Sequence, residues 1–183
     1  MLTDGTISLR QLQSGDVDAM YAAVRESIPE VSRWLPWCHQ GYARSETADF
    51  VAYAATVWKN NMQYPFGIFD AEGSGFLGGI SINHIARPNR LANVGYWVRT
   101  SRTRQGIAVR AVLLAARFAF EQQGLTRLEI ACLPTNTASR RVAEKAGARF
   151  EAIARNRLVM HGKAYDAALY SLLPDDVAST GHS

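Results

Sequence analysis

Cysteine is scarce in this 183-residue sequence, which contains only Cys38 and Cys132, far apart along the chain. Neither belongs to a Cys-x-x-Cys pair. Two such isolated residues exclude a disulfide-stapled scaffold and a zinc knuckle, because both need closely spaced cysteines. We therefore expect a protein of a reducing compartment, the cytoplasm.

Long apolar segments are also missing. The longest wholly apolar run is Ala111–Ala116, whereas a helix needs about 20 apolar residues to cross a bilayer. The first residues, Met-Leu-Thr-Asp, have neither the basic start nor the apolar centre of a secretory signal. We expect no membrane association, and we find no repeat of fixed period.

Lysine is the third shortage, since only three of the 20 basic residues are lysine and the rest are arginine. Arginine suits bidentate contacts with phosphate or carboxylate. The excess therefore has two explanations, an anionic partner or a biased base composition, and the net charge of +4 does not separate them. With 48% apolar residues, the size suits one domain over residues 1–173 and a polar tail over 174–183.

The spacing of apolar residues predicts an α+β (mixed α/β) fold with a mixed sheet. We expect the first helix to start at a Ser14 cap and to stop at Pro29, and residues 29–45 to be irregular. The predicted strands are 6–12, 64–69, 76–85, 91–99, 127–133, 149–158 and 164–172. The predicted helices are 14–27, 46–60, 108–123 and 135–146.

The segment that follows the predicted strand 91–99 carries the strongest chemical signal. Its loop contains Gly106 and leads directly into a helix, whose first N–H groups and dipole favour an anion. Gly106 lets the backbone approach a ligand closely, and Ala108 keeps the next turn small. Arg99, Arg102 and Arg104 lie beside this glycine and suit phosphate oxygens. The alternative is an ordinary strand-to-helix turn.

A second strand-to-helix junction places Asn136 and Ser139 at the start of the helix predicted over 135–146. Asn136 or Thr137 alone is explained by helix capping. Capping does not call for the hydroxyl of Ser139 inside the first turn. The two junctions together therefore favour a ligand site over two unrelated turns.

The order of several short motifs makes the chain resemble GNAT-superfamily N-acetyltransferases, specifically the RimJ/RimL-like (ribosomal-protein-alanine acetyltransferase-like) branch. The resemblance covers about residues 6–173. The matching residues are Ile7–Arg10, Trp34–Trp37, Gly95–Val98, Arg104–Ala108, Asn136–Ser139, Ala143–Gly147, Glu151, Gly162, Asp166 and Tyr170.

The resemblance implies a mostly antiparallel sheet of about seven strands, splayed between the fourth and fifth, with about four helices. Acetyl-CoA would enter that opening as acyl donor, without a metal. The backbone of Tyr96, Trp97, Val98 and Arg99 would pair with the pantetheine amides, and the N–H of Trp97 or Val98 would polarise the thioester carbonyl. The pyrophosphate would be cradled by Arg104, Gln105, Gly106, Ile107 and Ala108.

The same resemblance implies that Asn136 touches the pantetheine arm and that Ser139 protonates the leaving thiolate. The general base stays open, because relatives often carry a glutamate where this chain has Asn93. His84 is one candidate, since its ordinary pKa suits proton transfer, and Glu151 and water are the others.

The acceptor would be a primary amine, on a protein N-terminus or a small molecule. The loop that contains Trp34 and Trp37 would form one wall of its site, assisted by Arg25, Arg33 and His39. Alternatively, the loop is a hydrophobic plug over the first two helices.

Two other functions compete with an enzyme. A non-catalytic CoA-binding regulatory module would bind CoA without turnover. A nucleic-acid binder would use the arginine excess, but the arginines are scattered and no RNA-binding aromatic motif is present, so we expect no dedicated nucleic-acid site. A homodimer stays open, because such relatives are often dimers.

Overall fold

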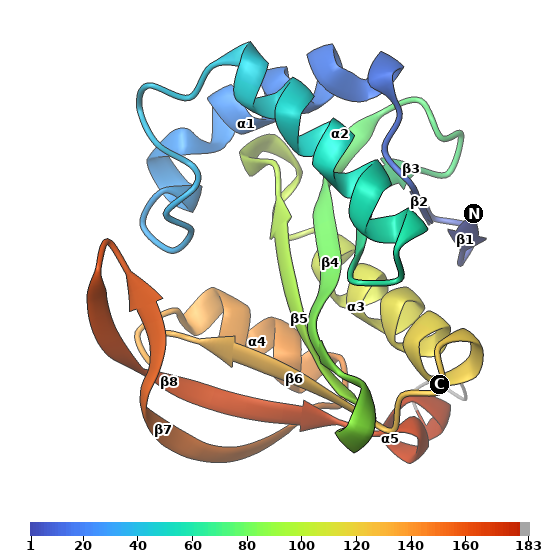
Figure 1. Cartoon of the computed structure of the whole chain (residues 1–183), viewed down its shortest axis with the longest axis vertical. Helices are drawn as coiled ribbons and strands as arrows, with labels where there is room; N and C mark the ends of the chain where they lie inside the picture. The colour runs from blue at the N-terminus through green and yellow to red at the C-terminus, as the bar shows by residue number, and fades with distance from the viewer. Residues whose placement is uncertain (180–183) are drawn as a thin grey trace.

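The computed structural model describes residues 1–179, which form one open sheet with helices on both faces (Figure 1). The eight strands of this part of the chain follow the order β1-β2-β3-β4-β5-β6-β8-β7. Only β5 and β6 run parallel to one another. The strands are β1 (Leu2–Thr3), β2 (Ile7–Arg10), β3 (Tyr64–Asp70), β4 (Phe76–Ala86), β5 (Leu91–Val98), β6 (Arg127–Cys132), β7 (Arg149–Met160) and β8 (Lys163–Leu172).

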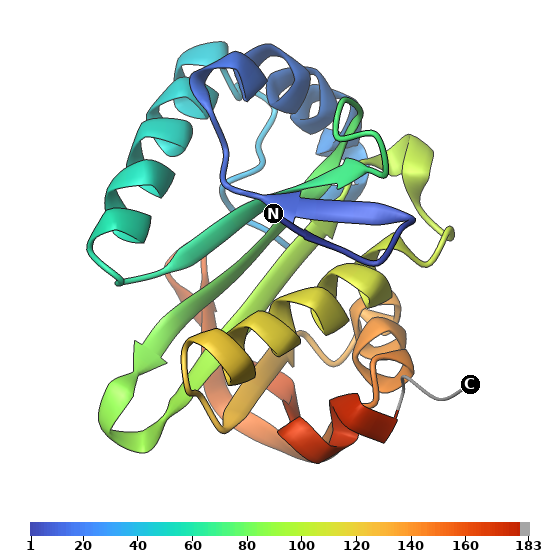
Figure 2. The same ribbon diagram turned by 90° about the vertical axis from the view of Figure 1, so that its right-hand side faces the viewer.

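The helices lie in two groups on opposite sides of the sheet (Figure 2). The apolar faces of the first two pack with Phe69 and Phe76 in one core, whereas the third and fourth bury theirs with Ile80, Val94 and Leu128 in another. The helices are α1 (Val17–Val31), α2 (Arg44–Lys59), α3 (Ile107–Arg117), α4 (Thr137–Lys145) and α5 (Pro174–Ser179).

The sheet opens between β5 and β6. These strands pair only where Leu91–Asn93 lies beside Arg127–Glu129. Beyond that point β5 pairs with β4 alone, through Val98, while β6 stays with β8. Figure 1 shows the resulting V, with β4 and β5 on one arm and β6, β8 and β7 on the other. The expected mixed sheet and its splay are confirmed.

The predicted helix over 108–123 changes its winding near its end. After α3 the chain continues as a π-helical turn, Phe118–Gln122. The ring of Phe118 is buried and contacts Trp58, Tyr64 and Phe66, with ring centroids 5.2–5.6 Å apart. This aromatic packing buries apolar surface, which stabilises the π-helical turn.

Two expectations about the first helix are wrong. Ser14 is not its cap: residues Ser14–Asp16 form a 3-10 turn, and the Asp16 carboxylate accepts the N–H of Gln13 at 2.7 Å. Pro29 does not stop the helix either, since α1 runs on to Val31. A proline in the last turn has no N–H to donate, so one helical hydrogen bond is missing. Burial of Val31 offsets that loss.

The ends of the domain also differ from expectation. The sequence pattern missed β1, a two-residue strand too short to show periodicity, so the sheet has eight strands and not seven. The tail expected from residue 174 begins as α5, whose Val177 is 5% exposed and belongs to the α3-side core. Burial of this side chain orders the segment. Residues 180–183 of the predicted tail lie outside the described part. No helix within residues 1–179 is long and apolar enough to span a membrane.

Candidate functional site

The loop between β5 and α3 has the geometry of an anion site. Gly106 caps α3 in the left-handed conformation, with φ of 76°. A Cβ built on Gly106 would meet no atom within 4 Å, so the space beside its backbone is open. Within residues 1–179, the N–H groups of Gly106, Ile107, Ala108 and Val109 have no acceptor. Four unpaired donors at a helix start attract a phosphate group.

The three arginines predicted beside this loop do not play one role. Arg99 is engaged by α1: its Nε donates to Glu26 at 3.1 Å, its Nη2 makes an ion pair with the same carboxylate, and its Nη1 donates to the Phe76 carbonyl. The expected phosphate contact by the Arg99 side chain is therefore not supported. Arg102 and Arg104 are exposed, and neither has an ion pair with any residue that the structure describes.

Helix α1 also fastens the loop backbone. Glu26 accepts the N–H of Ser101 at 2.7 Å, and Ser27 Oγ accepts the N–H of Thr100 at 3.1 Å. Thr100 in turn donates its hydroxyl to Glu30 at 2.9 Å. Arg99 and the hydrogen bonds from Ser101 together hold the pKa of Glu26 down, to about 2, against the effect of burial. The loop is thus set by a helix more than 70 residues earlier in the chain.

Across the opening, Tyr96 of β5 meets the first turn of α4. Its hydroxyl lies 3.0 Å from Ser139 Oγ and donates to the Ser139 carbonyl at 3.1 Å. Burial raises the pKa of Tyr96, and the Ser139 bond opposes this only in part. The phenol therefore stays protonated and can donate to Ser139 at neutral pH.

Asn136 caps α4, as the sequence suggested: its Oδ1 accepts the N–H of Ser139 at 3.1 Å. Cys132, at the end of β6, is 7% exposed. Burial raises the pKa of its thiol, whereas the Ser139 hydroxyl lowers it. A raised pKa disfavours the reactive thiolate.

The loop after α1 reaches β5 through one of its two tryptophans. The rings of Trp37 and Trp97 meet edge to face, with centroids 5.6 Å apart, and Trp37 is 39% exposed. Gly78 and Gly79 of β4 make room for Trp97: a Cβ on Gly78 would lie 2.2 Å from the Trp97 carbonyl oxygen, and one on Gly79 would lie 2.8 Å from Trp97 Nε1. Trp34 is half-buried and makes no such ring contact among the described residues.

The polar residues expected to border the acceptor beside the two tryptophans instead make contacts within their own part of the chain. Arg25 Nη1 donates to the carbonyls of Gln40 and Tyr42, at 2.9 and 3.4 Å. His39 Nε2 lies 3.0 Å from Glu46. Their expected contact with the acceptor has no support in this geometry. Arg33 is exposed.

His84 lies on β4 in the irregular stretch where the register with β5 shifts, and its φ is 49°. Its side chain is exposed and makes no hydrogen bond or ion pair within residues 1–179. Glu151 is held by Arg127 through two hydrogen bonds, 2.8 and 2.6 Å long. This pairing lowers the pKa of Glu151 to about 2. A carboxylate so acidic is a poor base, and its contacts with Arg127 favour the structural alternative.

Sequence reasoning missed a polar row on the sheet face that also carries Trp97. Asn93 Nδ2 donates to Asn83 Oδ1 at 2.9 Å, and Asn93 pairs in register with Glu129 of β6. Ser81, two residues before Asn83, has a buried Oγ without any hydrogen-bond partner in the described structure. Only the strand register, which joins residues far apart in the chain, could have shown this row.

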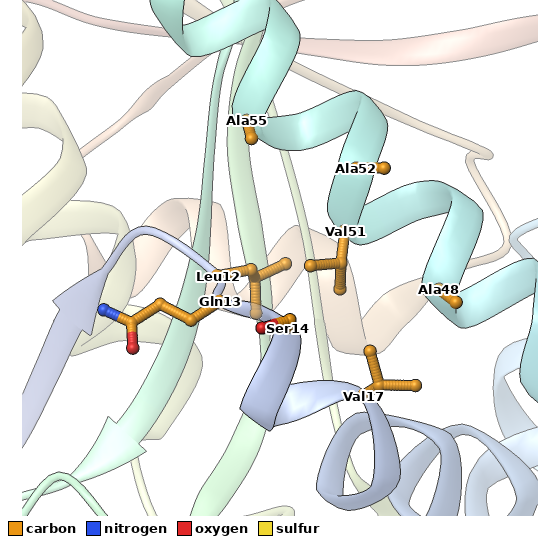
Figure 3. Close-up of a pocket in the computed structure, with 8 residues that line it drawn as sticks. All are labelled: Leu12, Gln13, Ser14, Val17, Ala48, Val51, Ala52 and Ala55. Carbon is orange, nitrogen blue, oxygen red and sulfur yellow. The ribbon is translucent and has the colours of Figure 1, made fainter.

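Two other features carry no chemistry. Among residues 1–179, no three His, Cys, Asp or Glu side chains group as a metal would need. An apolar hollow lies between the start of α1 and one face of α2 (Figure 3). None of its lining side chains is ionisable: Leu12, Gln13, Ser14, Val17, Ala48, Val51, Ala52 and Ala55.

Comparison with protein families gives a match over most of the chain. Residues 6–149 match the acetyltransferase (GNAT) domain. Among curated proteins, the chain is 36% identical to the probable N-acetyltransferase YjcK of Bacillus subtilis over 116 residues. That match spans 62% of this chain and 64% of YjcK.

Two solved structures share the fold over nearly the full length. The first is described as a "putative ribosomal-protein-serine acetyltransferase" from Vibrio cholerae, with a TM-score of 0.84 and 28% identity, over 94% of this chain and 97% of the other. The second is RimL, the ribosomal L7/L12 alpha-N-protein acetyltransferase, in complex with coenzyme A. Its TM-score is 0.85 at 22% identity, over 96% of this chain and 98% of the other.

Proposed function

Because this chain belongs to the acetyltransferase (GNAT) family and is an acetyl-CoA-dependent N-acetyltransferase, we propose that its acceptor is the α-amino group of a protein or peptide. The observation that carries the site assignment is the opening of the sheet after Asn93, directly beside the unpaired N–H groups of the α3 start. The opening would leave backbone groups of β5 free to pair with pantetheine. The unpaired N–H groups at the start of α3 would donate to the pyrophosphate.

The residues at the opening fit the donor. Gly106–Val109 would hold the pyrophosphate, with Arg102 and Arg104 free to approach its oxygens. The edge of Tyr96 and Val98 would pair with pantetheine, and Asn136 would lie along that arm.

Strand alternation selects between the two N–H groups considered for the thioester. Arg99 donates its N–H to Leu77 of β4. Because backbone groups alternate along a strand, Trp97 also faces β4, while Val98 faces the opening. The close approach of the Trp97 carbonyl to Gly78 agrees with this. We therefore assign the polarising donor to Val98.

The proposed chemistry is direct attack by a neutral amine. Acetyl-CoA supplies the acetyl group as a thioester. The N–H of Val98 stabilises the charge that develops on the carbonyl oxygen. Ser139 protonates the leaving sulfur, and Tyr96, 3.0 Å from its Oγ, supports that hydroxyl.

Two arguments favour an α-amine. An α-amino group has a pKa of about 7.7–8.0 against about 10.4 for lysine, so far more of it is neutral at pH 7. The solved relatives above are named for ribosomal-protein N-terminal or serine acetylation. Trp37 and Trp97 would border the residues that follow the amine.

The test is thiol release from acetyl-CoA with three acceptors: a peptide with a free N-terminus, the same peptide blocked at the N-terminus but carrying lysine, and a polyamine. We expect release with the first. Release with lysine alone would contradict the α-amine, and CoA binding without release from any amine would favour a regulatory module. Gly106→Glu should abolish CoA binding, because it adds bulk and negative charge at the phosphate position.

Two further expectations belong with this proposal. An acceptor on a ribosomal protein would place the enzyme in the cytoplasm. Strand β7 ends the sheet and exposes Phe150, Ile153 and Val159 at 49, 47 and 69%, which supports a homodimer through that edge. Sedimentation of the parent and of Ile153→Lys would test it: the parent should sediment as a dimer and the variant as a monomer.

A further inference from the structure

Ser81 stands out because its hydroxyl oxygen is buried and unpartnered within the described structure. Buried polar atoms nearly always have a hydrogen-bond partner, so a buried oxygen without one is unusual and marks a candidate ligand contact. Ser81 pairs in register with Gly95 of β5, and it lies on the same sheet face as Trp97. That position is two residue pairs from Gly79 and Trp97, on the strand next to the edge assigned to the thioester.

The polar row continues from Ser81 toward the closed end of the V. A Cβ on Gly95 would lie 3.7 Å from Asn83 Nδ2, so the Asn83 amide extends over the bare backbone of Gly95. Asn83 Oδ1 accepts from Asn93, whose own Oδ1 has no partner in residues 1–179. The row thus presents two unused acceptor oxygens, Ser81 Oγ and Asn93 Oδ1.

Glu129 supplies the charge at the end of this row. It lies opposite Asn93 in the last paired stretch of β5 and β6. Arg127 donates to one of its oxygens twice, from Nε at 3.2 Å and from Nη2 at 3.0 Å, and Arg157 donates to the other at 3.2 Å. An ionised carboxylate has about four acceptor positions, so these three contacts leave one position for a further proton donor.

We propose that Ser81 Oγ accepts a hydrogen bond from the acceptor amine, and that Asn83, Asn93 and Glu129 form a polar track that leads the amine's proton away. This inference rests on the proposed function. Ser81 is the group that touches the acceptor, whereas Asn83, Asn93 and Glu129 act as positioning residues through water.

The bonds and protons balance. The amine nitrogen forms the new N–C bond, and the C–S bond breaks with its electron pair on sulfur. Sulfur takes a proton from Ser139. The ammonium form first gives one proton to water, which carries it along the track to solvent while the charge of Glu129 stabilises it on the way. The second N–H proton, lost on amide formation, restores the Ser139 hydroxyl.

Ser81→Ala is the decisive variant, because removing an unpartnered oxygen breaks no existing bond. We expect the melting temperature to be unchanged or higher, CoA affinity to be unchanged, and the KM for the amine to rise about three- to tenfold. Calorimetric binding of the amine to the CoA-saturated protein, which cannot turn over, should weaken by the same factor. Ser74→Ala, in an exposed turn, is the matched control.

Glu129→Gln keeps the shape of the side chain but removes its charge. Its activity should fall more steeply than the parent's below pH 7, while Glu72→Gln on the exposed β3–β4 turn should follow the parent. Unchanged amine binding in Ser81→Ala, or a Glu129→Gln profile that matches the parent, would overturn the proposal. If the parent releases no thiol with any amine, the proposed function itself fails.

Discussion

Glu26 and Arg99 join α1 to the end of β5 through an ion pair and a second hydrogen bond from the arginine Nε, 3.1 Å long. The same carboxylate holds the N–H of Ser101. One acidic side chain therefore positions both the guanidinium of Arg99 and the backbone of the loop between β5 and α3. Without Glu26, Arg99 would keep only its bond to the Phe76 carbonyl, and the loop would keep only its hydrogen bonds to Ser27 and Glu30.

Glu26→Gln should lower stability in a pH-dependent way. The pKa of Glu26 is depressed in the folded protein from 4.5 to about 2. Its contribution is therefore present above pH 4.5 and is lost as pH falls toward 2. Because the pair is partly exposed, we expect a loss of about 1–2 kcal/mol in the free energy of unfolding at pH 7. Urea titrations of both proteins at several pH values measure the difference. A gap that persists undiminished at pH 2 would contradict this assignment.

Arg102→Gln and Arg104→Gln should each weaken CoA binding about fivefold at low salt, since partly screened charge pairs contribute up to about 1 kcal/mol. The effect should shrink as salt rises. Acetyl-pantetheine, which lacks the nucleotide, serves as the control substrate. Its KM should be the same in parent and variants, and an equal rise for both donors would show that the arginines do not act through the phosphates.

Ser139→Ala should lower kcat about 10- to 100-fold, because general acid assistance is lost while a thiolate remains a fair leaving group. The cap of α4 survives, since Asn136 accepts the backbone N–H of residue 139 and not its hydroxyl. Tyr96→Phe should have a smaller effect in the same direction. Steady-state kinetics with saturating acetyl-CoA measure both. An unchanged kcat in Ser139→Ala would leave sulfur protonation to water.

Trp37→Ala should raise the KM for a peptide acceptor without changing CoA affinity. The ring is 39% exposed and packs against Trp97, so its loss would remove one wall of the proposed acceptor site. Edge-to-face contacts contribute about 0.5–1.5 kcal/mol. Trp34→Ala is the comparison: an effect on KM as large as that of Trp37→Ala would mean that the loop acts as a whole and not through its contact with β5.

Much of the fold followed from local patterns. Alternating apolar residues placed seven strands, and the β5–α3 and β6–α4 junctions were visible as Gly106 and Asn136 before helical segments. Pro29 misled the prediction because its helix-breaking tendency is local, whereas the burial of Val31 that overrides it comes from tertiary packing.

The roles of individual side chains were harder to predict. Arg99 looked like a phosphate ligand because its partner, Glu26, lies 73 residues away. Arg25 and His39 likewise serve their own loop. Ser81 gave no signal at all, since an orphan hydroxyl is defined by its surroundings on neighbouring strands.

The three residue pairs that connect β5 to β6 also have a mechanical meaning. The two arms of the V are connected by this one short paired stretch, and α3 packs in a core with strands of both. A small rotation at Asn93 and Glu129 is magnified along the arms of the V. A molecule that bridges the two arms would supply the hydrogen bonds that β5 and β6 do not exchange there. It would also fix the angle between the two arms.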